Sequence, residues 1–185
     1  AMMHFAGEDG VAAITIIQYS QFLLNALFMG FSQGVSPVIS FNYGSGNQQQ
    51  LGQVFKTSLI FTLVTSAATF LLAQFGGSIV VGIFAEPGSP VYGLARHGFT
   101  IFAFSFLFSG FTIFASALFT ALSDGRISAV ISFVRTFGLI ITSLMVLPFL
   151  IGVDGVWLAI PIAELGGLLL SIHYMRKYRS TYHYA

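Results

Sequence analysis

Two charged residues, Arg135 and Glu164, stand inside long apolar stretches of this chain and are its first candidates for chemistry. An ionisable side chain at membrane depth is costly, so it is by default a candidate functional residue. Counting about 1.5 Å per helical residue places Arg135 roughly 13 Å and Glu164 roughly 18–20 Å from the same membrane face, so the two could meet. Two interpretations stay open: a structural ion pair, or a protonatable carboxylate at Glu164 that takes part in transport.

A stripe of polar side chains in the first apolar stretch is the second candidate. Its members are Gln18, Gln21, Asn25, Ser32 and Ser36, which at about 100° per residue fall in a band roughly 60° wide. A polar band of this kind cannot face lipid. It either forms hydrogen bonds that hold neighbouring helices together or lines a cavity.

Two prolines and two glycines modify the same stretches. Pro37 and Pro161 remove backbone hydrogen bonds and are predicted to bend their helices, Pro161 one turn before Glu164. Gly30 and Gly34 form a small-xxx-small pair, which predicts close packing of two helices.

Other kinds of chemistry find little support in the sequence. There is no cysteine, and the four histidines lack the spacing of a metal site. The serines and threonines lack a paired histidine and acid, so we expect no enzyme, no metal and no cofactor. The net charge of +1 and the absence of a basic cluster before the C-terminus argue against a nucleic-acid partner.

The composition indicates what must position these residues. Hydrophobic residues make up 56% of the 185 residues and charged residues only 7%, against roughly 25% charged in soluble domains. A lipid bilayer accommodates so much apolar surface, provided that the backbone satisfies its own polar groups in helices. We therefore predict an all-α integral membrane fold, with helices near 10–41, 51–84, 91–122, 126–150 and 154–177.

Short turns between these spans predict antiparallel neighbours in one transmembrane domain, residues 1–185. Basic residues gather at one end of the predicted bundle, and the positive-inside rule makes that end, with the C-terminus, cytoplasmic. The expected location is the cytoplasmic membrane, crossed several times. The opening residues, interrupted by 7–10, resemble a loop inside a longer chain more than a natural N-terminus.

Two motifs resemble a known family. Residues 33–37 (QGVSP) with 40–46 (SFNYGSG) resemble the second helix of the C-terminal lobe in multidrug and toxic compound extrusion (MATE) transporters. Residues 152–157 (GVDGVW) with 161–164 (PIAE) resemble the start of that family's last helix. The loop at 121–125 and Arg135 lie between them in the family's order, so the resemblance spans essentially the whole chain. Its bacterial multidrug-pump branch looks nearest.

The resemblance implies helices eight to twelve of a twelve-helix transporter, a partial six-helix lobe without helix seven and the N-terminal lobe. It implies export of cationic or aromatic compounds in exchange for protons or sodium ions, by rocking of two lobes. The third span has no carboxylate between Arg96 and Asp124, which argues against a sodium site there. The candidate residues of the substrate or ion pathway are Gln18, Gln21, Asn25, Gln33, Arg135 and Glu164.

Two alternative functions remain at this point. A polysaccharide or lipid-precursor flippase of the same superfamily would share the bundle but should line its cavity with several arginines for pyrophosphate. A truncated or non-transporting membrane subunit would use the polar stripe only to bind another membrane chain. The coding sequence upstream of the chain would distinguish such a subunit from part of a complete transporter.

Overall fold

The computed structural model describes residues 2–184, and in that part of the chain every regular element is a helix. Nine helical segments follow one another: α1 (Met2–Gly44), α2 (Gln48–Phe84), α3 (Pro90–Phe102), η1 (Ala103–Ser105), α4 (Phe106–Ala121), α5 (Gly125–Phe133), η2 (Val134–Ile140), α6 (Ile141–Ile151) and α7 (Val153–Tyr182).

Five membrane-crossing units result, because η1 joins α3 to α4 and η2 joins α5 to α6 without a turn. The spans Met2–Gly44, Gln48–Phe84, Pro90–Ala121, Gly125–Ile151 and Val153–Tyr182 are each long and apolar enough to cross a bilayer. The predicted five-helix membrane fold is therefore confirmed. The differences lie at the helix ends, where α1 begins earlier and α7 continues five residues further than expected.

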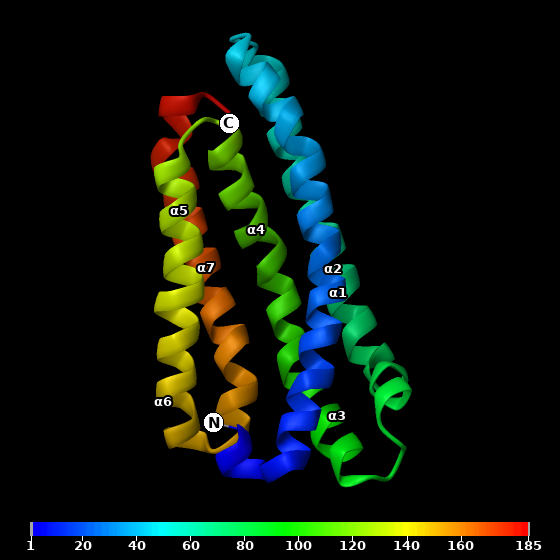
Figure 1. Ribbon diagram of the computed structural model, residues 1–185. Coiled ribbons are helices and arrows are strands. Elements are labelled where there is room, and N and C mark those ends of the chain that lie inside the picture. Colours follow the sequence, from blue (N-terminus) through cyan, green and yellow to red (C-terminus); the bar gives the residue numbers. More distant parts are fainter. Residues whose placement is uncertain (1, 185) are drawn as a thin grey trace.

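The N-terminal segment is the clearest departure from the expected loop. Residues on both sides of Gly7 are helical, and the helix axis changes direction at Gly7, whose φ is 58° and ψ −148°. Figure 1 shows the first few residues running across the foot of the bundle before α1 turns along it. Because a left-handed φ is costly for other residues, glycine suits this corner.

Local sequence explains where the helices begin. Asn47, Ser89 and Asp124 cap α2, α3 and α5, each by accepting a hydrogen bond from a backbone N–H three residues on. Pro90 follows Ser89 at the first position of α3, where a missing N–H costs nothing. The turns are consequently short, and sequential spans run antiparallel (Figure 1).

The centre of the bundle is α4, which contacts α1, α2, α5 and α7. Several phenylalanines of the third span are fully buried here, including Phe99, Phe106, Phe114 and Phe119. Most phenylalanines of this span therefore pack between helices. On the outside, large apolar side chains such as Phe75 remain exposed, as expected for a surface that faces lipid.

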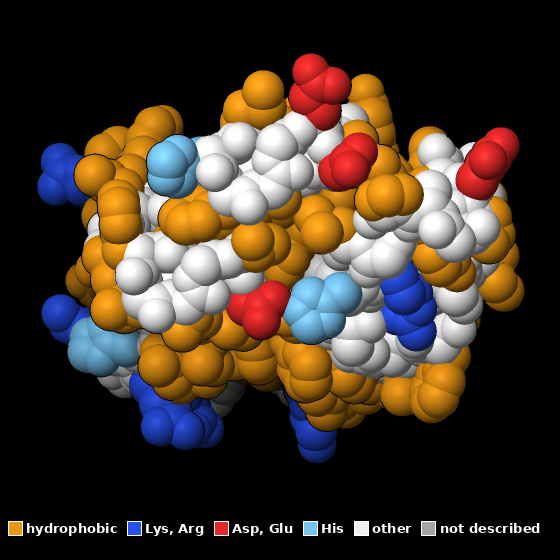
Figure 2. All heavy atoms as spheres, turned by 90° about the horizontal axis from the view of Figure 1, so that it is seen from below, with side chains coloured by type: hydrophobic (Ala, Val, Ile, Leu, Met, Phe, Trp, Pro, Cys, Tyr) orange, Lys and Arg blue, Asp and Glu red, His pale blue; other side chains and the backbone are white. Residues whose placement is uncertain are grey.

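The two ends of the bundle differ in charge. The turns 45–47 and 122–124 and the C-terminal end lie together, and they bring with them the basic residues Lys56, Arg126, Arg176, Lys177 and Arg179. The opposite end carries Glu8, Asp9, Glu86 and Asp154 together with Arg96, and Figure 2 views that face, with its acidic and histidine side chains. The predicted asymmetry is present in the folded chain.

Candidate functional site

Arg135 and Glu164 form an ion pair across the hairpin of the last two spans, as the sequence suggested. The Arg135 Nε lies 3.0 Å from both carboxylate oxygens of Glu164, and Nη2 lies 2.5 Å from Oε1. The Glu164 side chain is 1% exposed and that of Arg135 is 19% exposed. The pair is therefore inaccessible from the carboxylate side and open from the guanidinium side.

A third residue, which the sequence did not single out, completes this contact. The hydroxyl oxygen of Thr112, in α4, lies 3.5 Å from Glu164 Oε2 and 3.1 Å from the carbonyl oxygen of Phe108. Its single proton can be donated to either acceptor. A side chain at Gly167 would crowd this junction, because a Cβ there would lie 3.1 Å from Thr112 Cγ2 and 3.5 Å from Arg135 Cγ. The glycine lets α4, η2 and α7 approach one another.

The backbone that carries Arg135 is a π-helix, η2. Such segments are short insertions within α-helices and are frequent at functional sites, because the wider turn reorients the side chains next to it. Nothing in the sequence pattern signals this change of winding. The π-helical winding therefore explains why counting residues on an ideal α-helix does not predict the direction of the Arg135 side chain.

The prolines lie within continuous helices. α1 continues through Pro37, and α7 runs without interruption from Val153 to Tyr182 through Pro161. Neither proline ends its helix, and the bend that we expect at each stays a prediction.

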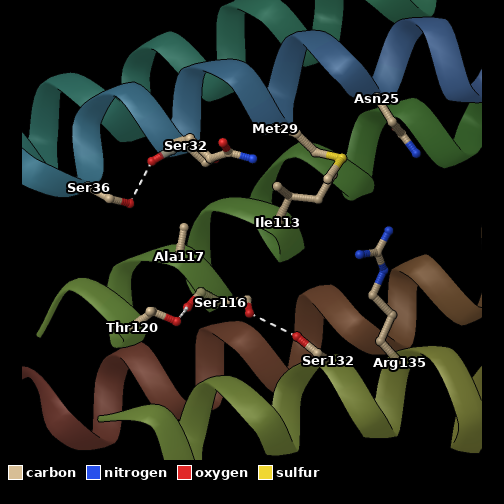
Figure 3. Close-up of a pocket in the computed structure, with 11 residues that line it drawn as sticks. Asn25, Met29, Ser32, Ser36, Ile113, Ser116, Ala117, Thr120, Ser132 and Arg135 are labelled. Carbon is tan, nitrogen blue, oxygen red and sulfur yellow. Dashed lines mark hydrogen bonds between the residues drawn. The ribbon is translucent and has the colours of Figure 1, made fainter. Parts of the chain in front are cut away.

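A polar cavity lies between α1, α4 and the α5–η2 helix, at mid-length of the bundle. Its volume is about 410 Å³, within the usual range for small-molecule sites. Figure 3 shows Asn25, Met29, Ser32 and Ser36 reaching down from α1, with Ser132 and Arg135 on the opposite wall. Its remaining lining residues are Gln33, Ile113, Ser116, Ala117 and Thr120.

Hydroxyl groups of α4 and α5 bond to one another along one wall of this cavity. The Ser116 Oγ lies 2.9 Å from Ser128 Oγ and 2.8 Å from Ser132 Oγ, and Thr120 donates to Ser128 Oγ at 2.8 Å. This cluster was not predicted from the sequence, although its signal was present: residues 116 and 120, and residues 128 and 132, are pairs at i, i+4.

The predicted polar stripe opens onto a groove on α1. Gln18, Gln21, Asn25 and Gln33 all line this groove, which has a volume of about 600 Å³ and shares Asn25, Met29 and Gln33 with the polar cavity. Among the described residues, the side chain of Asn25 has one hydrogen bond to another helix, from Ser109 Oγ at 3.3 Å. The glutamines have none within residues 2–184, so their geometry favours a cavity lining over hydrogen bonds between helices.

Gly30 and Gly34 do not mediate close helix packing in the described part of the chain, so that expectation is wrong. A Cβ at either position would meet nothing within 4 Å. The two glycines lie on the open side of α1, and Gly30 lines the groove.

At the acidic end, an exposed pair joins α3 to α7. The His97 Nε2 lies 2.8 Å from Asp154 Oδ1, with both side chains more than half exposed. Within residues 2–184 no group of three or more His, Asp or Glu side chains is placed to hold a metal ion.

The five apolar helices and the polar cavity among them define the chain as a multi-pass helical membrane protein. The family model for MatE matches residues 1–146, which is most of the chain. The chain therefore belongs to the MatE family of transporters, in agreement with the resemblance of its motifs.

Solved structures agree in fold. An outward-facing multidrug resistance MATE family transporter of the MOP superfamily and a MATE in complex with MaL6 each superimpose with a TM-score of 0.90 at 18% identity over 100% of this chain. An inward-facing transporter of the same description gives 0.88 at 19% identity over 98% of this chain. The chain spans 42% of the length of each of these solved chains. A search of curated proteins gives no match.

Proposed function

We propose that this chain is part of a secondary active exporter that carries small organic compounds, cationic or aromatic, out of the cell. Transport would proceed by alternating access between two lobes, driven by a gradient of protons or sodium ions. The family is one of transporters, and we propose no enzymatic role.

The observation that carries this proposal is the open, largely polar-lined cavity between apolar helices. Its lining mixes hydroxyl and amide groups with Met29, Ile113 and Ala117. Polar residues at membrane depth commonly mark substrate pathways, because each costs free energy unless it has a partner or contacts water. A cavity of mixed polarity suits amphipathic organic molecules.

We assign Glu164 a structural role in this scheme. Its carboxylate is held by Arg135 and is 1% exposed, so a proton or sodium ion would have to displace an existing partner to bind there. The coupling ion is therefore expected to bind elsewhere in the complete transporter.

The flippase alternative fits the cavity less well. A pyrophosphate group needs several cationic donors, whereas the lining of the polar cavity includes one arginine. We also propose that the basic end, with the turn 45–47 and the C-terminus, faces the cytoplasm of a cell-membrane protein.

An efflux assay tests the proposed function. Expressed alone in an efflux-deficient host, the 185 residues should not raise resistance to toxic organic compounds, because alternating access needs two lobes around a shared site. Expressed with a complementary lobe, they should raise it, and a collapsed ion gradient should abolish the effect. Gradient-dependent resistance from the 185 residues alone would contradict the two-lobe proposal.

A further inference from the structure

The unused hydrogen-bonding groups of the polar cavity are mainly donors, and this indicates what its ligand must offer. We propose that the cavity binds the oxygen acceptor of an amphipathic aromatic compound, a carbonyl or carboxylate, between the outer edge of Arg135 and the amide of Asn25. The proposal rests on the exporter function above and narrows its substrate class.

Arg135 supplies most of these donors. A guanidinium has five N–H groups in a rigid plane, and Glu164 uses those of Nε and one of Nη2, which leaves three. No described residue accepts from Nη1 at hydrogen-bond distance. Because the side chain is 19% exposed and lines the cavity, the free edge of Nη1 and Nη2 faces its interior.

Asn25 approaches the same space from α1. Its Oδ1 accepts a hydrogen bond from Ser109 Oγ. The two N–H groups of its Nδ2 have no partner among residues 2–184. Figure 3 shows the nitrogen of Asn25 pointing from α1 toward the Arg135 side of the cavity. An acceptor oxygen placed between these two sets of donors could bond to both.

Two further polar side chains line the cavity. Ser32 is 2% exposed, and its Oγ has no hydrogen-bond partner but is itself buried, so a ligand would reach it only after the surrounding side chains shift. Gln33 offers both a donor and an acceptor.

The remaining hydroxyls of the cavity are already satisfied. Ser116, Ser132 and Thr120 are bonded within the α4–α5 cluster. Among residues 2–184, the carboxylate next to the cavity is that of Glu164, which Arg135 covers. A simple organic cation would therefore find no free anionic partner here. A compound with an acceptor oxygen gains charge-assisted hydrogen bonds from Arg135, the stronger kind.

Three matched probes test this inference on the natural protein in lipid nanodiscs. 1-Naphthoate carries a carboxylate, 1-naphthamide a neutral carbonyl, and 1-naphthylmethylammonium a cation on the same ring system. We expect naphthoate and naphthamide to bind at least tenfold more tightly than the ammonium compound, since hydrogen bonds from charged donors contribute that much or more. Equal or tighter binding of the ammonium compound would overturn the proposal.

Two variants assign any binding to these residues. Arg135→Lys removes the planar donor edge but keeps the charge, and it should lower the affinity for naphthoate roughly tenfold or more. Asn25→Asp places a carboxylate opposite the guanidinium. The affinity for naphthoate should therefore fall at least tenfold, and the affinity for the ammonium compound should rise. Arg126→Lys and Asn47→Asp make the same changes far from the cavity and should leave all three affinities within about twofold.

The Asn25 variant keeps the test decisive if Arg135→Lys does not fold, because Asn25 is outside the ion pair. Unchanged naphthoate binding in Asn25→Asp would refute the acceptor site. Binding is measured without a gradient, so its failure leaves the export proposal standing. A lack of efflux in cells likewise leaves the binding result intact.

Discussion

Glu164→Gln is expected to destabilise the protein by about 3–5 kcal/mol, the usual cost of breaking a buried ion pair from one side. The substitution leaves the Arg135 guanidinium with a neutral partner on its buried side, where the Glu164 side chain is only 1% exposed. Adding Arg135→Gln should restore much of the loss, because the double variant has no unpaired charge. Thermal unfolding of the two single variants and the double variant in detergent measures the coupling.

An exposed pair provides the internal control. His97 and Asp154 are as close as an ion pair, but their side chains are 60% and 51% exposed, and such pairs contribute roughly 0–1 kcal/mol. Asp154→Asn should therefore cost far less than Glu164→Gln. Additive losses in the Arg135–Glu164 cycle would disprove the structural pair. A Glu164→Gln variant that folds and binds substrate but loses pH-dependent transport would instead assign Glu164 to coupling.

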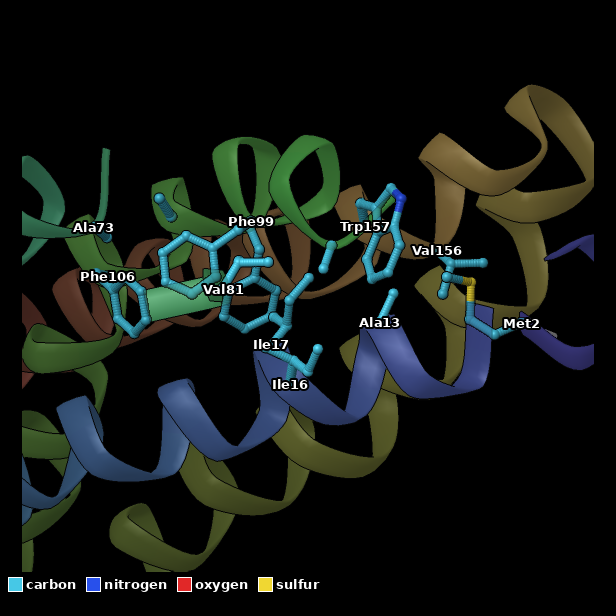
Figure 4. Close-up of a cluster of buried hydrophobic side chains, with 13 residues drawn as sticks. Met2, Ala13, Ile16, Ile17, Ala73, Val81, Phe99, Phe106, Val156 and Trp157 are labelled. Carbon is cyan, nitrogen blue, oxygen red and sulfur yellow. The ribbon is translucent and has the colours of Figure 1, made fainter. Parts of the chain in front are cut away.

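Gly98→Ala is expected to destabilise the bundle by about 1–3 kcal/mol, the range for overpacking a well-packed interior. A Cβ at this position would lie 2.6 Å from two atoms of the Trp157 ring system. Trp157 is 1% exposed and sits in the cluster of Figure 4, among Ala13, Phe99 and Val156. Because the ring is buried in this cluster, it can move only by displacing its neighbours.

Gly93 of the same helix makes the comparison sharp, because a Cβ there meets nothing within 4 Å. Gly93→Ala should be neutral or stabilising, by up to about 1 kcal/mol from helix propensity. Detergent unfolding should therefore show a loss of stability for Gly98→Ala and no loss for Gly93→Ala. Combining Gly98→Ala with Trp157→Phe should recover part of the loss, and no recovery would place the strain elsewhere.

The membrane fold could be predicted from the sequence because its main signal is coarse. Charges are excluded from hydrocarbon, so the gaps between charged residues mark the spans whatever the packing details are. The Arg135–Glu164 contact was predictable for a related reason. Two buried charges of opposite sign on neighbouring antiparallel helices have few other partners.

The shape of the site was not predictable, because it depends on local winding and on packing between distant segments. The π-helix at η2 changes the direction of Arg135 without a composition signal. Thr112 reaches Glu164 only because Gly167 allows α4 close to α7. Gly30 and Gly34 failed as a packing motif because spacing alone does not specify which face of α1 meets a neighbour.

The most direct test of the account is whether the polar cavity contains water in the membrane. The chain has no cysteine, so single cysteines can be placed at Ser132 in the cavity and at Ala68, exposed on the apolar face of α2. A hydrophilic, membrane-impermeant thiol reagent should modify the cysteine at Ser132 and spare that at Ala68, because a reactive thiolate forms in water and not in lipid. In intact cells, cysteines at Asn47 and Ser89 report orientation, and only the one at Ser89 should react. If the cysteine at Ser132 stays as unreactive as that at Ala68 with both membrane faces exposed to the reagent, the cavity is a dry packing interface and the proposed pathway is wrong.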